Sequence, residues 1–484
     1  MIPLPIANGS YESESLPISA QSCINWYANI VQTQGLSEET LFGTPGINQL
    51  ATSGTKEQVN RGSGKIGATP YFINGTTLWR LNKAGVDVEV FDLELMGTIP
   101  GEKRVFTATN GTQLMIVTEG RGWIFTEDPD SLVEILAGSF TANGTPETVE
   151  FISSYFVCTT DQKKAIISAQ NDGTSWNALD FISAEADPDP LSGLVAFKNQ
   201  LFLMGTETTQ VAAPIATSGV PLQIQPGYEI AKGLSAPHSV VVVNDSIMFI
   251  GAGKNESPAI WVIQGGAVQK VSTTAIDTKL QNFSADDIES SFAIPYAQKG
   301  AYFINFYLPD TCFSFNTITG RWNEIQSDIV DIFGNVQTIR SRVNTIITGY
   351  GRVLVADSQD GRVGEMSPEF FTEYGESIKR TLVTQPFSNN GFSFSVNKLE
   401  ATFEAGVGDS ITVNPVVRMS RSKDGKTFSD ERSRFLGKRG EYNKRSIWPR
   451  LGRVGRFELF KFVFSDPVKP AFIKLEADIK QGNK

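Results

Sequence analysis

The sequence contains very few of the residues that usually carry catalysis and metal binding. Its 484 residues include a single histidine, His238, which excludes a histidine-based metal site. The three cysteines, Cys23, Cys158 and Cys312, are far apart and have apolar neighbours, so we expect buried thiols and no disulfide framework. No run approaches the roughly 18 apolar residues of a membrane span, and the first residues lack the basic and apolar pattern of a signal peptide. We therefore expect cytoplasmic synthesis and no membrane segment.

The short motifs that often mark an active site are also missing. The chain has no P-loop, and Gly251-Ala-Gly253 lacks the third glycine and the following helix of a dinucleotide site. Residues 357–365 lack the alternating oxygen ligands of a calcium loop and are typical of a hairpin turn. His238 follows Pro237 at the start of an apolar run, which favours a polar loop residue over a catalytic base. The sequence therefore predicts no catalytic, cofactor-binding or metal-binding residue, and no enzyme.

Short β-branched and aromatic runs dominate the rest of the chain. In residues 239–263, three apolar runs are divided by Asn244-Asp245 and by a polar loop. Such runs are too short for helices and predict strands of a meander. Similar units of three or four strands recur about every 40–50 residues, with the seventh unit the weakest. This period predicts an all-β fold with a β-propeller of about seven blades. A pair of β-sandwiches is the alternative, since it uses the same strands without the period.

Segments outside the repeats set the predicted domain boundaries. Residues 1–63 predict an extended N-terminal arm that docks through Asn25, Trp26 and Tyr27. Residues 64–380 form the predicted propeller, with loop insertions around 185–190 and 214–237 and a helix within 275–288, where Ser284 resembles an N-cap. Residues 381–484 alternate on a two-residue period, which predicts a C-terminal β-sandwich.

The charge is distributed unevenly. Residues 418–456, called here the basic segment, carry a net charge of +9, whereas the remainder of the chain carries −19. This segment supplies the candidate interface residues Arg421, Lys438, Arg439, Lys444, Arg445, Trp448, Arg450 and Arg453. The segment is able to contact nucleic-acid phosphates or an acidic protein such as another copy of this chain, and an ordinary solvated face is the third interpretation.

The exposure of three tryptophans distinguishes between two possible functions of the propeller. If Trp123, Trp176 and Trp322 are exposed and stack on sugars, the protein is a carbohydrate-binding or glycan-degrading propeller. If they pack within the blades, their role is structural.

Several motifs in a fixed order resemble one known family. They are Ser19-Ala-Gln-Ser-Cys-Ile-Asn-Trp-Tyr27, Thr44-Pro-Gly-Ile47, Ser246-Ile-Met-Phe-Ile-Gly251, Ala259-Ile-Trp-Val-Ile263, Ser284-Ala-Asp-Asp287, Ser422-Lys-Asp-Gly425 and Trp448-Pro-Arg-Leu-Gly-Arg453. Together they span nearly the whole chain. In this respect the chain resembles the tail-hub family of short-tailed bacteriophages, also called the tail nozzle or packaged-DNA stabilization family.

The resemblance implies a non-enzymatic structural protein of the virion tail, synthesised in the host cytoplasm. In this family a homo-hexameric ring lies below the portal and the adaptor (head-completion) ring, extends the channel through which DNA leaves, and helps to retain packaged DNA. The expected neighbours are a tail needle or plug and tail fibres or tailspikes. DNA is expected to pass without sequence-specific binding, and an acidic body suits such a channel because it repels phosphate.

Overall fold

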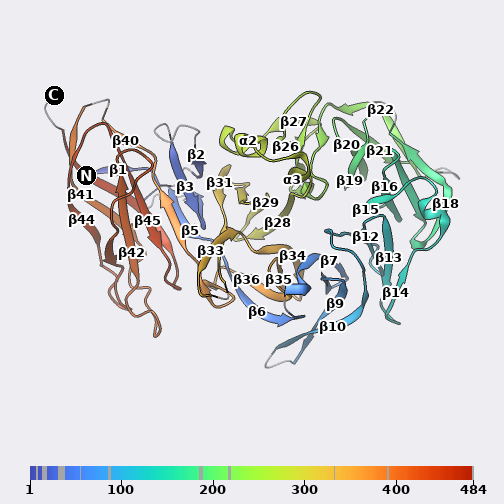
Figure 1. The fold of residues 1–484 in the computed structure, drawn as a ribbon, viewed down its shortest axis with the longest axis horizontal. Helices are drawn as coiled ribbons and strands as arrows, with labels where there is room; N and C mark the ends of the chain where they lie inside the picture. The colour runs from blue at the N-terminus through green and yellow to red at the C-terminus, as the bar shows by residue number, and fades with distance from the viewer. Residues whose placement is uncertain are drawn as a thin grey trace.

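The computed structural model describes residues 1–6, 9–12, 19–30, 37, 39–54, 56–85, 89–184, 189–215, 220–331, 333–389 and 392–481. Most of its regular structure is β, and the chain forms a ring of blades with a sandwich beside it (Figure 1). Within these ranges no helix is both long enough and apolar enough to cross a membrane.

Seven sheets, counted over the described ranges, form the blades of a propeller. From the inner to the outer strand, blade 1 consists of β7 (Asn60–Ile66), β8 (Thr69–Asn74), β9 (Thr77–Ala84) and β10 (Val90–Thr98), blade 2 of β11 (Phe106–Thr109), β12 (Gln113–Thr118), β13 (Arg121–Thr126) and β14 (Ser131–Glu134), and blade 3 of β15 (Pro146–Ile152), β16 (Tyr155–Thr160), β17 (Lys164–Ala169) and β18 (Asp172–Ser183). Blade 4 consists of β19 (Leu191–Phe197), β20 (Gln200–Gly205), β21 (Thr209–Pro214) and β22 (Leu222–Ile230), and blade 5 of β23 (Gly233–Leu234) with β24 (Val241–Val243), β25 (Ser246–Ala252), β26 (Ala259–Gln264) and β27 (Ala267–Lys270). Blade 6 consists of β28 (Phe292–Gln298), β29 (Ala301–Tyr307), β30 (Cys312–Asn316) and β31 (Arg321–Glu324), and blade 7 of β34 (Val343–Gly349), β35 (Arg352–Asp357), β36 (Arg362–Ser367) and β6 (Gly46–Thr52).

The inner strands close the ring. Each packs against the inner strand of the next blade, and β34 of blade 7 packs against β7 of blade 1. Radial closure of this kind leaves only short, protected sheet edges. The all-β class and the propeller predicted from the repeat period are therefore confirmed.

The middle strands of the blades explain the apolar runs in the sequence. Phe72, Ile116 and Phe249 lie in such strands and are fully buried, because neighbouring blades cover both faces of each sheet. The turns between strands need unusual backbone angles: Gly75 and Asn244 have φ values of 55° and 51°. Glycine adopts this left-handed region freely and asparagine tolerates it. Buried runs and these turns together set where each strand begins and ends.

The outer strand of blade 7 comes from the N-terminal part of the chain. β6 pairs antiparallel with β36, which places Ile47 opposite Met366. The sequence predicted an arm up to residue 63 with no repeat unit. Instead, β6 completes blade 7, and β7 begins blade 1 at Asn60. The last part of the predicted arm therefore belongs to the propeller, which local patterns do not reveal because the paired strands lie at opposite ends of the propeller sequence.

Blade 4 also differs from the prediction. Residues 214–237, predicted as an insertion, contain the outer strand of blade 4 (β22) and the first strand of blade 5 (β23). β22 is polar because much of it faces solvent. Residues 216–219, and 185–188 of the other predicted insertion, lie outside the described residues. Next to the latter, Asp189 accepts the backbone N–H groups of Glu207 (2.8 Å) and Thr208 (3.0 Å), which anchors the start of blade 4.

A few elements lie outside the blades. The helix predicted within 275–288 is two short helices, and Ser284 caps the second through reciprocal hydrogen bonds with Asp287. The elements outside the blades and the sandwich are α1 (Gly138–Thr141), α2 (Thr274–Gln281), α3 (Ala285–Glu289), η1 (Lys56–Gln58), η2 (Pro237–Ser239), and the strand pairs β32 (Gln326–Val330) with β33 (Val336–Arg340) and β37 (Thr372–Glu373) with β38 (Glu376–Ser377).

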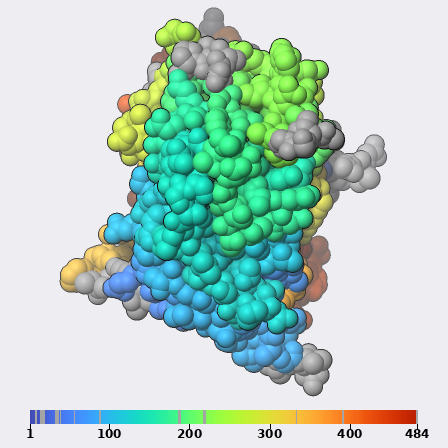
Figure 2. Space-filling view, turned by 90° about the vertical axis from the view of Figure 1, so that its right-hand side faces the viewer, coloured from blue at the N-terminus to red at the C-terminus, as the bar shows by residue number. Residues whose placement is uncertain are grey.

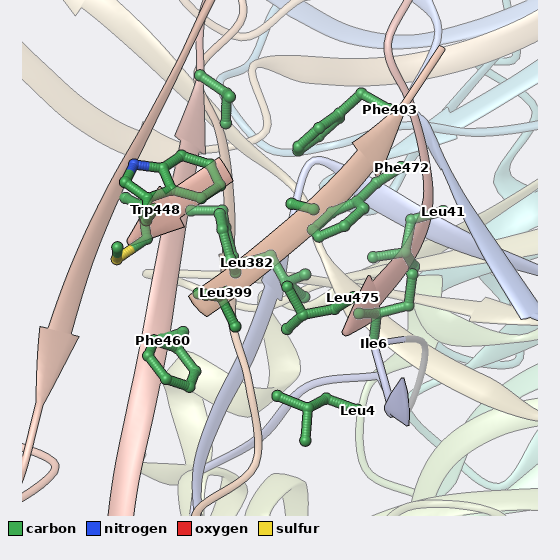
Figure 3. Packing of buried hydrophobic residues seen from close by; sticks show 14 of the residues in the cluster. Leu4, Ile6, Leu41, Leu382, Leu399, Phe403, Trp448, Phe460, Phe472 and Leu475 are labelled. Carbon is green, nitrogen blue, oxygen red and sulfur yellow. The ribbon is translucent and has the colours of Figure 1, made fainter. Parts of the chain in front are cut away.

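The C-terminal region forms the predicted β-sandwich, with help from the N-terminal strands. One sheet contains β1 (Ile2–Leu4), β4 (Trp26–Ile30), β5 (Glu39–Gly43), β46 (Ala471–Gln481), β41 (Phe394–Phe403) and β44 (Ser446–Val454). The other is continuous with blade 6 through the pairing of β3 with β31, and beyond that blade it contains β2 (Tyr11–Glu12), β3 (Ala20–Ile24), β39 (Arg380–Val383), β40 (Phe387–Ser388), β45 (Phe457–Phe464), β42 (Val416–Ser422) and β43 (Arg432–Phe435). Leu4, Leu41, Leu399, Phe460 and Phe472 fill the space between the two sheets (Figure 3).

Candidate functional site

The basic segment lies at one lateral edge of the sandwich. Among the residues that the structure describes, β43 pairs only with β42 and β44 only with β41, so each is the last strand of its sheet. Two hydrogen bonds join these edge strands: the guanidinium of Arg434 donates to Ile447 O (2.6 Å), and the indole of Trp448 donates to Arg432 O (2.8 Å). Both edges therefore face the same side, and they carry basic side chains there.

Trp448, predicted as an interface residue, belongs to the sandwich core. Its side chain is fully buried and lies among the core residues between the sheets (Figure 3). Its ring meets Phe462 edge to face, with 5.7 Å between the ring centres. Burial of the ring with its N–H group satisfied stabilises the domain. Trp448 is therefore removed from the candidate interface.

Two of the predicted interface arginines neutralise buried carboxylates of the same chain. Arg421 lies 3.2 Å from Glu458, whose pKa is raised by burial and lowered by this arginine. Arg445 forms two hydrogen bonds of 2.6 Å with Glu400, and these lower the pKa of the Glu400 carboxyl to about 2. The charge of either arginine is thus largely balanced inside the sandwich. Sequence reasoning missed both pairs because the acidic partners lie outside the basic segment.

The other five predicted residues remain free to contact a partner. Lys438, Arg439, Lys444, Arg450 and Arg453 are exposed, and none makes an ion pair with another residue of the described ranges. A protein surface with several unbalanced cations of one sign attracts anionic surfaces.

Exposed apolar side chains accompany these cations. Phe435 on β43 and Tyr442 in the following loop expose 53% and 71% of their surface. Ile411 and Val413 are also exposed, in a loop whose Gly406 N–H donates to Leu436 O. Sequence reasoning missed these two, although apolar residues isolated in a Gly- and Asp-rich loop were a usable signal. Aromatic residues and arginine are the types that dominate protein interfaces.

The predicted docking residues lie at the junction of the two domains. The side chain of Asn25 donates to Gln326 O (2.9 Å) and Lys379 O (2.8 Å) and accepts the N–H of Gln326 (3.0 Å). Its φ of 57° is left-handed, which asparagine tolerates. Asn25 thus connects β32, which follows blade 6, to the segment that enters the sandwich.

Trp26 and Tyr27 divide between the two domains. Trp26 packs in the sandwich core, 6.4 Å from Phe464 between ring centres, whereas Tyr27 packs edge to face on Phe303 of blade 6 at 5.2 Å. Consecutive residues of a strand point to opposite faces, so β4 contributes to both cores. β3 strengthens the junction, since it pairs with β31 of blade 6 on one side and with β39 of the sandwich on the other.

Blades 2 to 5 and α3 line an open cavity of about 1170 Å³ whose lining includes Phe106, Glu119, Glu147 and His238. His238 lies in η2 and stacks on Phe106, with 3.7 Å between ring centres. Burial, and then the nearby Arg104, hold the pKa of His238 well below its usual value, so the ring is neutral. Within the described ranges no cluster of three or more His, Cys, Asp or Glu residues is arranged to hold a metal ion.

The tryptophans that distinguish the two propeller functions are buried. Trp123, Trp176 and Trp322 expose 3%, 8% and 4% of their surface and belong to the packed interior of the blades. A buried indole has no face free for a sugar. Their role is therefore structural, and the carbohydrate-stacking prediction loses its support.

Comparisons with known proteins match both domains. A family model described as the β-propeller of bacteriophage P22 Gp10 matches residues 2–370, and one described as the β-sandwich of the same protein matches residues 379–480. The tail hub protein gp10 of Salmonella phage P22 is 20% identical over 286 residues. That match covers 57% of this chain and 58% of the relative, so the chain spans little more than half of the relative's length.

Similar solved structures are more distant. The WD40 β-propeller domain of Doa1 is 11% identical at a TM-score of 0.40, covering 66% of this chain and 97% of that chain. The extracellular domain of the hybrid two-component system BT4673 of B. thetaiotaomicron is 9% identical at a TM-score of 0.43, covering 73% of this chain and 45% of that chain. Similarity at these TM-scores carries no argument about function.

Proposed function

The chain belongs to the bacteriophage P22 Gp10 family, and from this premise we propose that it is a structural, non-enzymatic component of a phage tail. The observation that carries the proposal is the family match over both domains in order, propeller first and sandwich second. The named relative is a tail hub protein, and a hub role fits a chain built from two domains joined by shared strands.

In the finer form of this proposal, copies of the chain form a homo-hexameric ring in the virion tail. The ring lies below the portal and the adaptor ring, extends the channel for DNA and helps to retain the packaged genome. Further neighbours are a tail needle or plug and tail fibres or tailspikes. The net charge of −19 outside the basic segment supports a conduit role, because an acidic wall repels DNA phosphates and prevents sticking during passage.

The exposed cations of the sandwich edge supply the contact surface in this proposal. Lys438, Arg439, Lys444, Arg450 and Arg453 are the predicted interface residues whose charge is not balanced within the described part of the chain. Exposed Phe435 and Tyr442 add apolar area beside them. Such a combination favours a protein partner over DNA, because phosphate contacts need the charges but not the apolar side chains.

Negative-stain electron microscopy tests the proposal directly. The purified full chain is imaged alone and after mixing with the portal–adaptor complex of its own virion. Rings with six-fold symmetry, or a six-fold density seated beneath the adaptor, are the expected result. A monomer that neither forms rings nor binds the portal–adaptor complex would overturn the proposed function.

A further inference from the structure

The outer strands of the first four blades carry charges of one sign. β10, β14, β18 and β22 contain six carboxylates and no lysine or arginine. We call these six residues the acidic rim: Asp92, Glu94, Glu134, Asp172, Asp180 and Glu229. The pattern stops after blade 4, because β27 of blade 5 contains Lys270 and β31 of blade 6 contains Arg321.

Only part of this rim is neutralised within the chain. Glu94 pairs with Arg80 and Glu134 pairs with Arg121, both at 2.7 Å. Asp92 and Asp180 make no ion pair within the described residues. Apolar side chains emerge between the carboxylates: Leu95, Leu179 and Tyr228 expose 60%, 78% and 66% of their surface. The rim is thus both anionic and partly apolar.

The edge of the sandwich has the opposite composition. β43 and β44 contain four arginines and no carboxylate. These residues, the arginine edge, are Arg432, Arg434, Arg450 and Arg453. Exposed Phe435 and Tyr442 lie beside them. The acidic rim and the arginine edge therefore carry charges of opposite sign, and both include exposed apolar side chains.

The two surfaces lie at opposite ends of the molecule. Figure 1 places β44 at the far left, β14, β18 and β22 at the far right, and β10 along the lower border. Figure 2, which views the molecule from that right-hand side, shows the blades as one continuous surface. Two complementary surfaces at opposite ends of one chain cannot meet within that chain, but they can meet between copies.

We propose that the arginine edge of one copy docks on the acidic rim of the next copy. This inference rests on the proposed function, because it specifies the contact that builds the ring. The contact is head-to-tail, so it uses two different surfaces and closes into a ring when the rotation between copies allows it. Charge complementarity speeds the encounter and excludes like-to-like pairing, and the exposed aromatic and aliphatic side chains supply the apolar centre.

Edge protection is the competing explanation of the same charges. Edge strands present unpaired backbone groups, and charged side chains along them prevent non-specific strand pairing. Protection requires charges of either sign at each edge. It does not require one sign at one end of the molecule and the other sign at the opposite end, which is what these strands carry.

Two charge-reversed variants of the full chain test the docking proposal. The rim variant is Asp92→Lys with Asp180→Lys, and the edge variant is Arg432→Glu with Arg450→Glu. Each variant alone sets the introduced charges against natural charges of the same sign and removes much of the attraction at every contact, so we expect loss of the ring in both, measured by native mass spectrometry at low salt. A one-to-one mixture should restore it, since its contacts alternate between a natural edge on a natural rim and the introduced glutamates facing the introduced lysines.

Matched controls reverse equal numbers of exposed charges elsewhere. Glu369→Lys with Glu376→Lys controls for the rim variant, and Lys65→Glu with Lys254→Glu controls for the edge variant; we expect both controls to assemble as the natural chain does. Circular dichroism establishes that every variant is folded.

The outcomes separate the two proposals. Rings in either folded variant alone, or a mixture that fails to associate, would overturn the docking proposal and leave the proposed function standing. If the natural chain forms no ring but the two variants bind each other one to one, the docking proposal is supported and the proposed ring is contradicted.

Discussion

The carboxylate of Glu400 pairs with Arg445, and this ion pair is the reason why Arg445 is no longer a candidate interface residue. This carboxylate is buried, and the two hydrogen bonds from Arg445, together with Lys398 at 2.9 Å, hold its pKa at about 2. Because the folded-state pKa lies below the ordinary value of 4.5, the ionised carboxyl contributes stability above pH 4.5. That contribution is lost as the pH falls from 4.5 toward 2.

The Arg445→Ala variant should therefore show a pH-dependent loss of stability. We expect a modest loss of stability at pH 7, because the Arg445 side chain is 61% exposed and solvent screens the ion pair. The loss should shrink as the pH is lowered through the range from 4.5 to 2. Urea unfolding at pH 7 and pH 3 measures the loss of stability at each pH. The Arg445→Lys variant keeps one charged hydrogen bond, so its stability should lie between those of the natural chain and Arg445→Ala. An equal loss at both pH values would contradict this account.

At the scale of elements, β6 depends on a close approach of backbones. A Cβ atom at Gly46 would lie 2.5 Å from the carbonyl oxygens of both Phe370 and Thr372. Real Cβ atoms do not approach that closely, and a backbone oxygen cannot rotate away. The glycine of the Thr44-Pro45-Gly46 motif is thus explained by packing of β6 beside the segment that follows blade 7.

Substitution of that glycine should loosen the seventh blade. We expect Gly46→Ala to reduce the free energy of unfolding by roughly 1–3 kcal/mol, the usual effect of forcing extra atoms into a packed site. Gly138→Ala is the control, because nothing lies within 4 Å of its Cβ position. Chemical denaturation of both variants measures the effect. Equal stabilities would show that blade 7 can shift without cost.

The repeat units were visible in the sequence because each blade folds from neighbouring residues. The seventh unit was the weakest for a physical reason: three of its strands follow one another, but the fourth, β6, lies far upstream. The outer strand β22 was predicted as an insertion because its exposed residues are polar. Strand patterns therefore reveal buried middle strands well, and outer strands and long-range pairs poorly.

The candidate interface was predicted with the same limits. A local count of charges found the basic segment, and five of its eight predicted residues are exposed and unbalanced within the described ranges. It could not show that Arg421 and Arg445 pair with Glu458 and Glu400, because those contacts depend on which strands become neighbours. Trp448 was predicted as an interface residue because its neighbours in sequence are basic. Its side chain points into the sandwich core, and the arrangement of the two sheets determines that orientation.

At the scale of the whole molecule, Asn25 controls how firmly the two domains are coupled. Three hydrogen bonds of its side chain end on Gln326 and Lys379. The Asn25→Ala variant would leave partly buried backbone groups of Gln326 and Lys379 without this partner, at a cost of up to about 1–3 kcal/mol each when no water replaces it. It also places alanine at a left-handed φ.

Differential scanning calorimetry should detect this loss of coupling. We expect the natural chain to unfold in one main transition and Asn25→Ala to unfold at lower temperature, in two resolved transitions. Asn25→Gly, which relieves the backbone strain but not the lost hydrogen bonds, serves as the comparison. A single unshifted transition in the alanine variant would show that β3 and β4 couple the domains without this side chain.

The pairing of the N-terminal strands has a consequence for how the protein is made. β1 pairs with β46, β3 with β39 and β6 with β36, so these early strands leave the ribosome long before the partners with which they pair. At roughly 5–20 residues per second, this delay lasts on the order of tens of seconds. A chain whose translation stops before β36 lacks the partner of β6 in blade 7, and one that stops before β46 lacks a central strand of the sandwich. Truncated products are therefore unable to complete both domains.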